Sequence, residues 1–500
     1  MNCTKSRLQS LRAPHVFGRL VTPNSSLKEL SGSKTIDKFD PLTVIGKAPK
    51  PRQATLPHEL ATKIGEISWQ WTPQELRQRV AAIYASLKEG TPHKATSDHL
   101  DVSANITGLF LQNYISLKTC LAEVHKRLTT SSDKKIKFQP KSVLDVGFGP
   151  GTGILVAREL WPDIEYEKAV IYGDREMKKE AKRIIDNSEK VVFVDELPSD
   201  TSPQTFDLII CQHQLYTKGE NPENKIAILS KKLGQLLNPG GVLLFAERGD
   251  PLGFESIASA RRALLLSNIN DSDSPVESSN EQTNHQSKKN NETPGDNVTV
   301  NTSIPLNNSD SSTNSNVNTV FKSVAPCNHD KPCPLSVGLS QRLSAKNPGK
   351  FNWCTFDQNI KRPKYTLELK RGQYLSQKWV PGMQQGTGGS VIKGNGRTGS
   401  NNYEIANFSW VSMQKELQSS NQEASLSSKW PRIMKDPMNR HNHATMEVCT
   451  DGKIQHWTVP KSQGKQCYHD IRRAQAMDLW PFDAKTKQDR GGVPEKFRLQ

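Results

Sequence analysis

A glycine-rich turn is the first segment of the chain with the character of a cofactor site. The apolar run at residues 142–146 leads into four glycines spaced two apart, at 147, 149, 151 and 153, and a helical pattern follows at 154–160. Glycines here let a ligand approach the backbone, and a carboxylate after the next strand can accept hydrogen bonds from a ribose. The spacing fits S-adenosylmethionine better than a dinucleotide; the alternative is a turn that binds nothing. The residues expected to bind the cofactor are Asp145, Gly147, Gly149, Gly151 and Asp174.

Four cysteines in the C-terminal third of the chain have the character of metal ligands. Cys327 and Cys333 frame five residues, and Cys354 and Cys449 follow further along. Four thiolates can complete a tetrahedral site and suit zinc or an iron–sulfur cluster equally, with His329 as a substitute ligand. The spacing does not choose between these metals, and the alternative is four unrelated free thiols. The polar, proline-flanked setting of Cys327 and Cys333 argues against thiols that merely fill a core.

A basic segment with interleaved aromatic residues is the candidate nucleic-acid surface. Residues 361–400 contain eight Lys or Arg, the single acid Glu368, and Tyr365, Tyr374 and Trp379. Cations contact phosphates and rings stack on unpaired bases, so this composition favours RNA over a membrane surface. The alternative is a solvated basic loop. The residues expected to bind RNA are Lys361, Arg362, Lys370 and Arg371, with Arg472, Arg473 and the tail from Lys485 to Arg498 as extensions of the same surface.

The sequence assigns no reaction. An amino-group methyltransferase usually has a polar residue, two prolines and an aromatic residue after the fourth strand, where this chain has residues 211–214, Cys-Gln-His-Gln. Cys211 follows two isoleucines in an apolar strand, which favours a core thiol over a nucleophile. His213 is a candidate general base, although a single histidine on a loop is more often solvated. Catalytic residues are therefore left unassigned, and methyl transfer stays an open alternative.

Overall composition limits the classes of protein to consider. The chain has 500 residues, of which 34% are hydrophobic, and a mean hydropathy of −0.65. Two or three folded units with much loop or disordered sequence are expected. The net charge of +16 favours polyanionic partners. No apolar run approaches the roughly 18 residues that a spanning helix needs, so no membrane span is predicted.

Periodicity indicates the elements that would position these residues. Helical spacing over 56–128 predicts a helical unit, and residues 143–266 alternate short apolar runs with amphipathic stretches, as in a doubly wound α/β sheet. Strands are expected at 142–146, 169–172, 191–194, 208–211 and 242–246.

Residues 267–320 contain 13 Asn, 11 Ser and no aromatic residue, which predicts disorder. The predicted divisions are a presequence at 1–35, a helical unit at 36–135, a methyltransferase-like α/β core at 136–266, the disordered insertion at 267–320, a cysteine-containing module that completes the core at 321–481, and a basic tail at 482–500.

The first 28 residues have the composition of a mitochondrial presequence. They hold five Lys or Arg and several Ser, with no acid before Glu29, and they lack the apolar core of a secretory signal. The alternative is a frayed basic terminus, because Pro14 and Pro23 interrupt helical amphipathicity. Eight cysteines are too sparse for a secreted disulfide scaffold and fit a reducing compartment. The expected location is the mitochondrial matrix.

In combination, several segments resemble a known family. The glycine turn at 143–153, the segment 246–254, the Cys327 and Cys333 pair, Trp353-Cys354 and the closing 478–481 are similar to methyltransferase-like assembly factors of the mitochondrial small ribosomal subunit. The resemblance implies a class I methyltransferase fold that carries a 4Fe-4S cluster and binds small-subunit rRNA. The implied cluster ligands are Cys327, Cys333, Cys354 and Cys449, the last because it alone is followed by an Asp-Gly turn. The insertion and the residues around Asp174 depart from the family pattern.

The expected function is therefore assembly of the mitochondrial small ribosomal subunit or translation by it. The expected partners are small-subunit rRNA and ribosomal proteins, with the protein bound to the ribosomal particle as a monomer. One alternative is an active S-adenosylmethionine-dependent rRNA methyltransferase, and another is a permanent structural protein of the subunit. Transfer of labelled methyl groups to rRNA distinguishes the first alternative, and stoichiometric sedimentation with mature ribosomes distinguishes the second.

Overall fold

The computed structural model describes most of the chain between residues 38 and 490. The described ranges are 38–88, 98–129, 138–147, 149–171, 175–198, 204–216, 221–270, 319–345, 351–370, 402–417 and 429–490. The predicted presequence, residues 271–318 of the predicted insertion, Asp174, Arg371 and residues 491–500 lie outside them. In the described part, no helix combines the length and the apolar character needed to cross a membrane.

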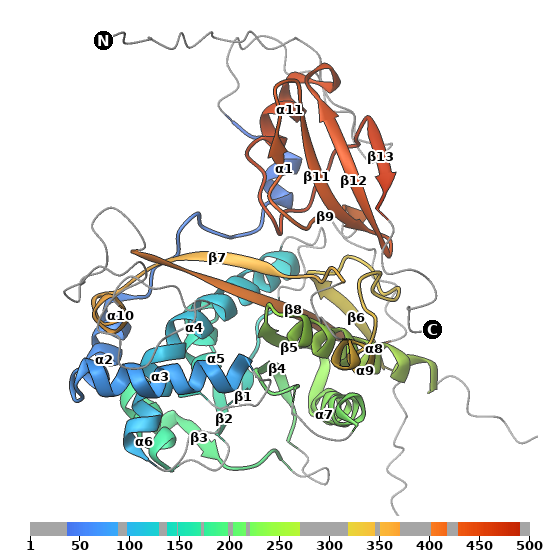
Figure 1. The fold of residues 1–500 in the computed structure, drawn as a ribbon. Helices are drawn as coiled ribbons and strands as arrows, with labels where there is room; N and C mark the ends of the chain where they lie inside the picture. The colour runs from blue at the N-terminus through green and yellow to red at the C-terminus, as the bar shows by residue number, and fades with distance from the viewer. Residues whose placement is uncertain are drawn as a thin grey trace, which may run out of the picture.

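An eight-stranded sheet organises the larger part of the molecule (Figure 1). Its strand order is β3-β2-β1-β4-β5-β8-β6, and β7 pairs with the first half of β8. β1 to β5 are parallel, whereas β8 runs antiparallel to β5, β6 and β7. This mixed order is that of the class I methyltransferase fold, as predicted. The strands are β1 (Ser142–Gly147), β2 (Tyr166–Ile171), β3 (Val191–Val194), β4 (Phe206–Gln212), β5 (Leu237–Arg248), β6 (Thr319–Ala325), β7 (Phe356–Lys361) and β8 (Tyr403–Leu417).

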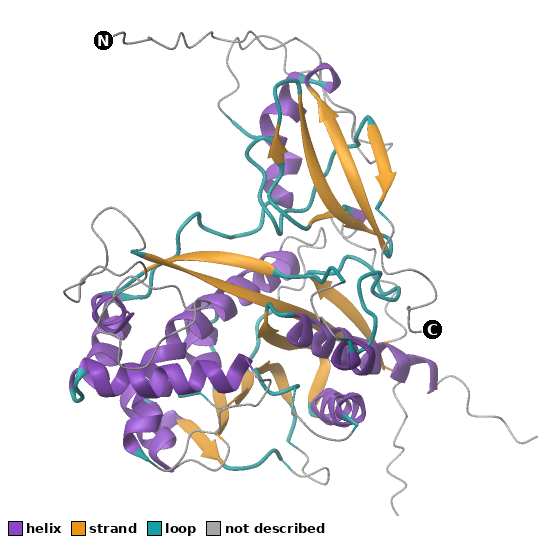
Figure 2. Ribbon diagram, viewed as in Figure 1, coloured by secondary structure: helices purple, strands orange, loops and turns teal. Residues whose placement is uncertain are grey.

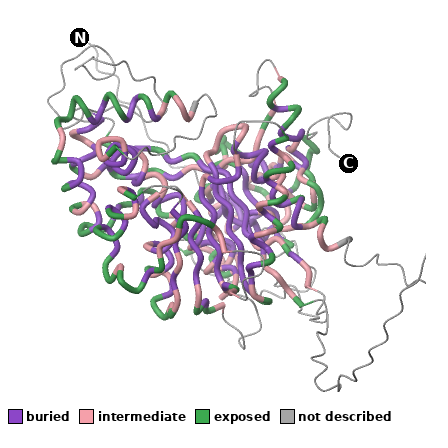
Figure 3. Tube along the Cα trace, turned by 90° about the horizontal axis from the view of Figure 1, so that it is seen from below, coloured by how far each residue is buried: buried purple, intermediate pink, exposed green. Residues whose placement is uncertain are grey.

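Helices cover both faces of this sheet, which explains why its strands are apolar without alternation. On one face lie α2, α4, α5 and α6, and on the other lie α7 and α8. The layers are visible in Figure 2, and Figure 3 shows the buried strands between more exposed helices. The helices of this part are α2 (His58–Trp69), α3 (Pro73–Lys88), α4 (His99–Thr129), α5 (Thr152–Leu160), α6 (Arg175–Ile184), α7 (Pro222–Gln235), α8 (Pro251–Asn270), α9 (Leu339–Ser344) and α10 (Lys364–Lys370).

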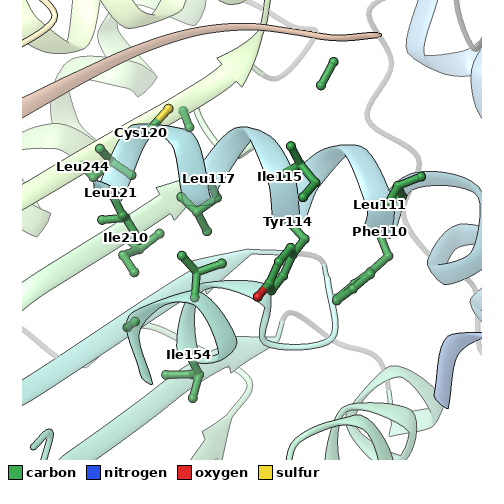
Figure 4. Close-up of a cluster of buried hydrophobic side chains, with 14 of the residues drawn as sticks. Phe110, Leu111, Tyr114, Ile115, Leu117, Cys120, Leu121, Ile154, Ile210 and Leu244 are labelled. Carbon is green, nitrogen blue, oxygen red and sulfur yellow. The ribbon is translucent and has the colours of Figure 1, made fainter. Parts of the chain in front are cut away.

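The long helix α4 forms much of the first core. Its side chains pack against α5 and against strands β4 and β5 through Ile154, Ile210 and Leu244 (Figure 4). In β4 the neighbouring Ile209 points to the opposite core, because successive side chains of a strand alternate between the faces. The helical N-terminal part is therefore one wall of the α/β core, packed on the sheet.

A second, smaller sheet forms the C-terminal unit. Its order is β10-β11-β12-β13, with β9 paired to β11. The elements are β9 (Arg432–Ile433), β10 (Met438–Asn439), β11 (His443–Thr450), β12 (Lys453–Pro460), α11 (Lys465–Ile471) and β13 (Thr486–Asp489). β13 pairs with β12, and Phe482 is buried, so residues 482–490 belong to this sheet and the expected tail boundary at 482 is too early.

Helix α1 (Pro41–Gly46) also belongs to the C-terminal unit, although the sequence grouped it with the other N-terminal helices. The Thr43 hydroxyl donates to the Asp470 carboxylate at 2.7 Å. The Leu479 N–H donates to the Gly46 carbonyl at 2.8 Å. Figure 1 shows α1, from the start of the described chain, in the same unit as α11. The two ends of the described chain are thereby joined in one unit.

Candidate functional site

The glycine turn between β1 and α5 is organised by Asp145. Its Oδ2 atom accepts the Gly153 N–H at 2.8 Å and the Ile154 N–H at 3.4 Å. Gly151 precedes α5 with a φ of 76°, a left-handed conformation that favours glycine. A Cβ at position 153 would lie 2.4 Å from Asp145 Oδ1, so this glycine is required by the carboxylate beneath it. Gly153 was not among the residues expected to bind the cofactor, and its constraint comes from Asp145 and not from a ligand.

A cavity of about 340 Å³ lies at the carboxyl ends of the parallel strands. Asp145, Gly147, Gly149 and Gly151 line it, so the structure brings four of the five predicted cofactor residues together. The ends of β2, β4 and β5 contribute further walls, and α3, α4 and β8 close the remaining sides. Doubly wound sheets bind their ligands at this position. Its volume lies within the range of small-molecule sites.

A polar cluster in this cavity surrounds His213. Its Nδ1 atom lies 3.4 Å from Glu247 Oε2, and its Nε2 atom lies 3.1 Å from Asn113 Oδ1. His213 has a φ of 57°, and the other Glu247 oxygen accepts the Leu215 N–H at 2.9 Å. The His213 side chain is therefore held in the cavity by contacts with Glu247 and Asn113. The sequence had favoured a solvated histidine on a loop. Asn113 and Glu247 lie 100 and 34 residues away from it, and no local spacing in the sequence relates them.

Cys211 does not take part in this cluster. It is fully buried in β4 within the second core, and burial raises the pKa of its thiol well above the usual value. A protonated thiol enclosed by apolar side chains is not poised as a nucleophile. The prediction of a core thiol is confirmed.

The four cysteines predicted to bind metal face a second, smaller cavity of about 40 Å³. Cys327, Cys333 and Cys354 come from the segment between β6 and β7, and Cys449 comes from β11 of the C-terminal unit. His329 lies among them, with its Nε2 atom 3.6 Å from the Cys449 sulfur. Within the described residues, no group of three or more His, Cys, Asp or Glu is arranged to hold a metal ion. The metal-binding module is therefore not shown, and the ligand set stays a prediction.

Two buried arginines hold the loop that carries Cys327 and His329. Arg261 donates to the Lys331 carbonyl at 3.0 Å and also to the carbonyl of His329. Arg432 donates to the Pro326 carbonyl at 2.8 Å and to that of Met477 at 2.6 Å. Each guanidinium thus fixes the backbone of the cysteine loop to a neighbouring element.

The thiols of Cys333, Cys354 and Cys449 are protonated in the metal-free protein at neutral pH. Burial and the neighbouring Cys327 raise the pKa of Cys333 to about 12. Burial and the other thiols raise the pKa values of Cys354 and Cys449 well above the usual value, although Arg432 opposes the shift in both. A metal that binds these thiols must displace their protons, so the affinity of the site for metal should depend on pH.

The two cavities share a wall. The Trp353 indole N–H donates to the Gly249 carbonyl at 2.9 Å. Gly249 lines the larger cavity, and Trp353 precedes Cys354 of the smaller one. The Ser409 hydroxyl donates to the Cys354 carbonyl at 2.7 Å, and its neighbour Phe408 lines the larger cavity. One layer of backbone therefore separates the two sites.

The residues predicted to bind RNA do not form one exposed surface. Arg362 and Lys370 are buried and pair with Glu404 at 3.1 and 3.0 Å, and burial lowers the pKa of Lys370 to about 8. Buried, paired cations cannot reach phosphates, so this expectation is corrected for both residues. Lys361 is exposed, and Arg371 lies outside the described residues.

Comparisons with known proteins agree with this architecture. The family model for the mitochondrial small ribosomal subunit protein Rsm22 matches residues 110–274 and 389–481. The mitochondrial ribosome assembly protein RSM22 of Saccharomyces cerevisiae is 30% identical over 484 residues, covering 83% of this chain and 72% of that protein. The mitochondrial Rsm22-cox11 tandem protein 2 of Schizosaccharomyces pombe is 25% identical and covers 75% of this chain, which spans 42% of the tandem protein.

One solved structure illustrates a distant similarity. The plantazolicin methyltransferase BpumL, in a complex with S-adenosylhomocysteine and a substrate analogue, matches 40% of this chain and 66% of its own. The sequence identity is 17% and the TM-score is 0.24. The fold assignment therefore depends on the strand order, and the family assignment depends on the match of sequence. By that match, the chain belongs to the Rsm22 family of the mitochondrial small ribosomal subunit.

Proposed function

We propose that this protein assists assembly of the mitochondrial small ribosomal subunit in the matrix by binding its rRNA and ribosomal proteins. The observation that carries the proposal is the 30% identity, over 83% of this chain, to a yeast protein named for ribosome assembly. The net charge of +16 suits an RNA partner. The methyltransferase-like core serves mainly as a scaffold that holds the two cavities and the C-terminal unit.

Depletion of the protein in mitochondria tests the assembly role. Sucrose-gradient sedimentation is expected to show fewer mature small subunits and an accumulation of their precursors, with the protein itself sedimenting with the precursors. Large subunits are the internal control, because the proposed role concerns the small subunit alone. Stoichiometric sedimentation with mature ribosomes would favour a permanent structural protein instead. Unchanged gradients after depletion would contradict both roles.

The smaller cavity is proposed to hold a 4Fe-4S cluster, with zinc as the alternative. The donor set fits, because Cys327, Cys333, Cys354 and Cys449 are free thiols that line one cavity. A bound cluster would supply strong thiolate bonds that tie the segment between β6 and β7 to β11. Metal-binding energy of this kind is folding energy, on the order of 10 kcal/mol for structural zinc. Loss of one ligand should therefore destabilise the whole protein.

Serine variants of the cysteines test this ligand set. Cys327→Ser, Cys333→Ser, Cys354→Ser and Cys449→Ser should each lower protein abundance and bound iron after anaerobic purification. The matched control is Cys467→Ser, because Cys467 is buried in the separate core of the C-terminal unit. Iron and labile sulfide at about four each per chain would identify the cluster, whereas zinc would give a colourless protein. Wild-type iron content in all five variants would exclude the site.

S-adenosylmethionine is the cofactor proposed for the larger cavity. The glycine turn would hold it, since Gly147 and Gly149 line the cavity and have no side chain to fill it. When bound, the cofactor would supply an electrophilic methyl group. The residues of this chain would orient it, and the helices α3 and α4 would limit access of water. Calorimetry with S-adenosylhomocysteine tests binding, and Gly149→Val should abolish it, since the larger side chain meets Thr152 Oγ1 only 3.3 Å from its own Cβ.

An active rRNA methyltransferase is the second candidate function. The observation that favours it is His213, held by Glu247 and Asn113 at the end of β4 beside the glycine turn. Purified protein, labelled S-adenosylmethionine and small-subunit rRNA should then give labelled RNA, and His213→Asn should abolish the labelling. Absence of labelling by a protein that binds the cofactor would favour the scaffold role.

A further inference from the structure

A group of cations on the C-terminal unit surrounds Tyr468 of α11. The Lys461 Nζ atom lies 5.7 Å from the centroid of the Tyr468 ring, and the guanidinium carbon of Arg472 lies 5.6 Å from it. The Tyr468 hydroxyl donates to the Arg440 carbonyl at 3.3 Å, which places the Arg440 backbone at the same ring. Arg473 follows Arg472 in the chain. Below, the cationic face means Arg440, Lys461, Arg472 and Arg473.

The cationic face lacks acidic partners in the part of the chain that the structure describes, where no salt bridge joins any of its four cations to a carboxylate. Asp470 of the same helix is fully buried, and its Oδ2 atom accepts the Asp40 N–H at 3.0 Å and the Thr43 hydroxyl. Its Oδ1 atom accepts from Gln466 at 2.8 Å and lies 2.7 Å from the His469 ring nitrogen. This carboxylate is therefore engaged inside the unit and does not neutralise the face.

Three other cations of the same unit are paired with carboxylates. Lys487 forms a salt bridge with Asp483, while Arg490 and Lys435 both pair with Glu447. Lys487 also lies over the Trp457 ring, on the β12–β13 side of the sheet. The cationic face differs from these three cations because its charges cluster at the Tyr468 ring without a carboxylate partner among the described residues, which leaves them available to an external anion.

The geometry of the face suits phosphates of a nucleic acid. Three of its four cations are arginines, whose planar guanidinium groups bind phosphate oxygens in pairs. Arg440, Arg472 and Arg473 are exposed, and the Tyr468 ring restrains Lys461 and Arg472 by cation–π contact before any ligand binds. Lys47 adjoins the face, because its Nζ atom donates to the Arg473 carbonyl at 3.2 Å. Membrane insertion requires several exposed apolar side chains beside the cations, and in the described part of the C-terminal unit the large exposed apolar side chains are Met438 of β10 and Val44 of α1.

We propose that the cationic face docks on the sugar–phosphate backbone of an RNA segment. The proposal rests on the rRNA-binding function proposed above and gives it a location on the C-terminal unit, away from the buried Arg362 and Lys370. Recognition through phosphates positions the protein on RNA without reading its sequence. Sequence or shape preference would then come from other parts of the molecule.

The test compares two triple variants of the full-length protein. The test variant is Arg440→Gln, Lys461→Gln and Arg472→Gln, and the matched control is Lys435→Gln, Lys487→Gln and Arg490→Gln. Both remove three cations from the same unit, but the control removes cations that are already paired. Affinity for a small-subunit rRNA fragment and for an unrelated RNA is measured from about 50 to 200 mM salt. The test variant should bind both RNAs more weakly, and its salt slope should fall by up to about 2, at about 0.7 per lost phosphate contact. The control should keep the wild-type slope.

The outcomes separate this proposal from the proposed function. A test variant that is folded by circular dichroism and binds with the wild-type slope overturns the cationic face and leaves rRNA binding to another surface. Wild-type protein that binds neither RNA overturns the rRNA-binding function as well. Vesicles of phosphatidylcholine with and without cardiolipin serve as the competing surface. Loss of cardiolipin-dependent binding in the test variant, with RNA binding unchanged, would assign the face to a membrane and overturn the proposal.

Discussion

Asp145 is a carboxyl group held inside the protein by two backbone N–H groups of α5. Burial raises its pKa to about 6, and the N–H groups oppose that shift only partly. In the unfolded chain the Asp145 carboxyl has its usual pKa of 3.8. As the pH rises, Asp145 therefore loses its proton in the unfolded state before it does so in the folded state. The stability of the folded state should therefore fall between about pH 4 and 6, by up to about 3 kcal/mol, and stay lower above that range.

Asp145→Asn should remove this pH dependence, because the amide oxygen can accept the same N–H groups and does not ionise. Urea unfolding is measured from about pH 4 to 7. The midpoint of the wild type should fall relative to that of the variant as the pH rises, so the two midpoints should differ least at low pH and most near pH 7. The exposed Asp163→Asn is the control and should track the wild type. Parallel curves for wild type and Asp145→Asn would show that the carboxylate does not titrate in this range.

Single residues also show what the sequence could and could not predict. Asp145 and the glycines were identifiable because their constraint is local, within one strand and one helix start. Arg362 and Lys370 were misassigned because the acid that neutralises both, Glu404, lies more than 30 residues away in β8. Local composition indicated a basic segment, whereas in the fold Glu404 of β8 pairs with Arg362 and Lys370 inside the protein. Long-range pairing of this kind leaves no signal in the spacing of the segment itself.

At the scale of elements, the segment between β6 and β7 joins the two cavities through Trp353. Trp353→Phe keeps most of the ring volume and removes the hydrogen bond to Gly249, worth about 1 kcal/mol. We expect calorimetry to show about fivefold weaker binding of S-adenosylhomocysteine, and we also expect lower iron retention. Both effects follow because this hydrogen bond connects the Gly249 loop of the larger cavity to the Cys354 segment of the smaller one. Trp69→Phe is the control, because Trp69 lies exposed at the end of α2, away from both cavities, and its indole N–H donates to Glu368 of α10 at 3.2 Å. Wild-type values in both measurements would mean that the two cavities are independent.

Arg432 links the α/β core to the C-terminal unit, because it contacts Glu123 of α4, the Pro326 carbonyl and the Met477 carbonyl. It pairs with Glu123 of α4, and Glu123 also pairs with Arg127. Burial opposes ionisation of Glu123, but Arg432 and Arg127 together hold its pKa below the usual value. Arg432→Met should cost about 3–5 kcal/mol, because it leaves a buried charge poorly compensated. Limited proteolysis should then cut the C-terminal unit first, while the paired but exposed Lys435→Met should resemble the wild type.

For the whole molecule, the positions of strands β1 to β5 along the chain were predictable, whereas the contacts that bring distant segments together were not. The parallel strands are apolar runs bounded by turn residues, so each could be recognised from its own segment, although their spatial order β3-β2-β1-β4-β5 is not the order of the chain. The convergence of Cys327, Cys333, Cys354 and Cys449 on one cavity follows the resemblance and not the spacing, because β11 brings Cys449 back across 95 residues from Cys354. The placement of α1 against α11, and of residues 482–490 in the second sheet, depends on contacts between the two ends of the chain.

The ends of the predicted insertion are held together independently of the residues between them. The Phe321 N–H donates to Asn268 Oδ1 at 2.8 Å, and the Asn268 amide donates back to the Phe321 carbonyl at 3.0 Å. Asn268 lies in α8 and Phe321 in β6, so part of the region predicted to be disordered, at 267–270 and 319–320, belongs to regular elements. This reciprocal pair fixes the start of β6 beside the end of α8.

Replacement of residues 271–318 by a short Gly-Ser linker should therefore leave the fold intact. Shortening the loop changes its closure entropy only slowly, by about 0.6 kcal/mol for each halving of its length, so the variant should be as stable as the wild type or slightly more stable. Thermal unfolding and circular dichroism check this expectation. Asn268→Ala in the shortened chain is the companion variant and should lower the melting temperature, because it breaks both hydrogen bonds that align β6. Failure of the shortened chain to fold, with Asn268 intact, would show that residues 271–318 contribute contacts that the sheet requires.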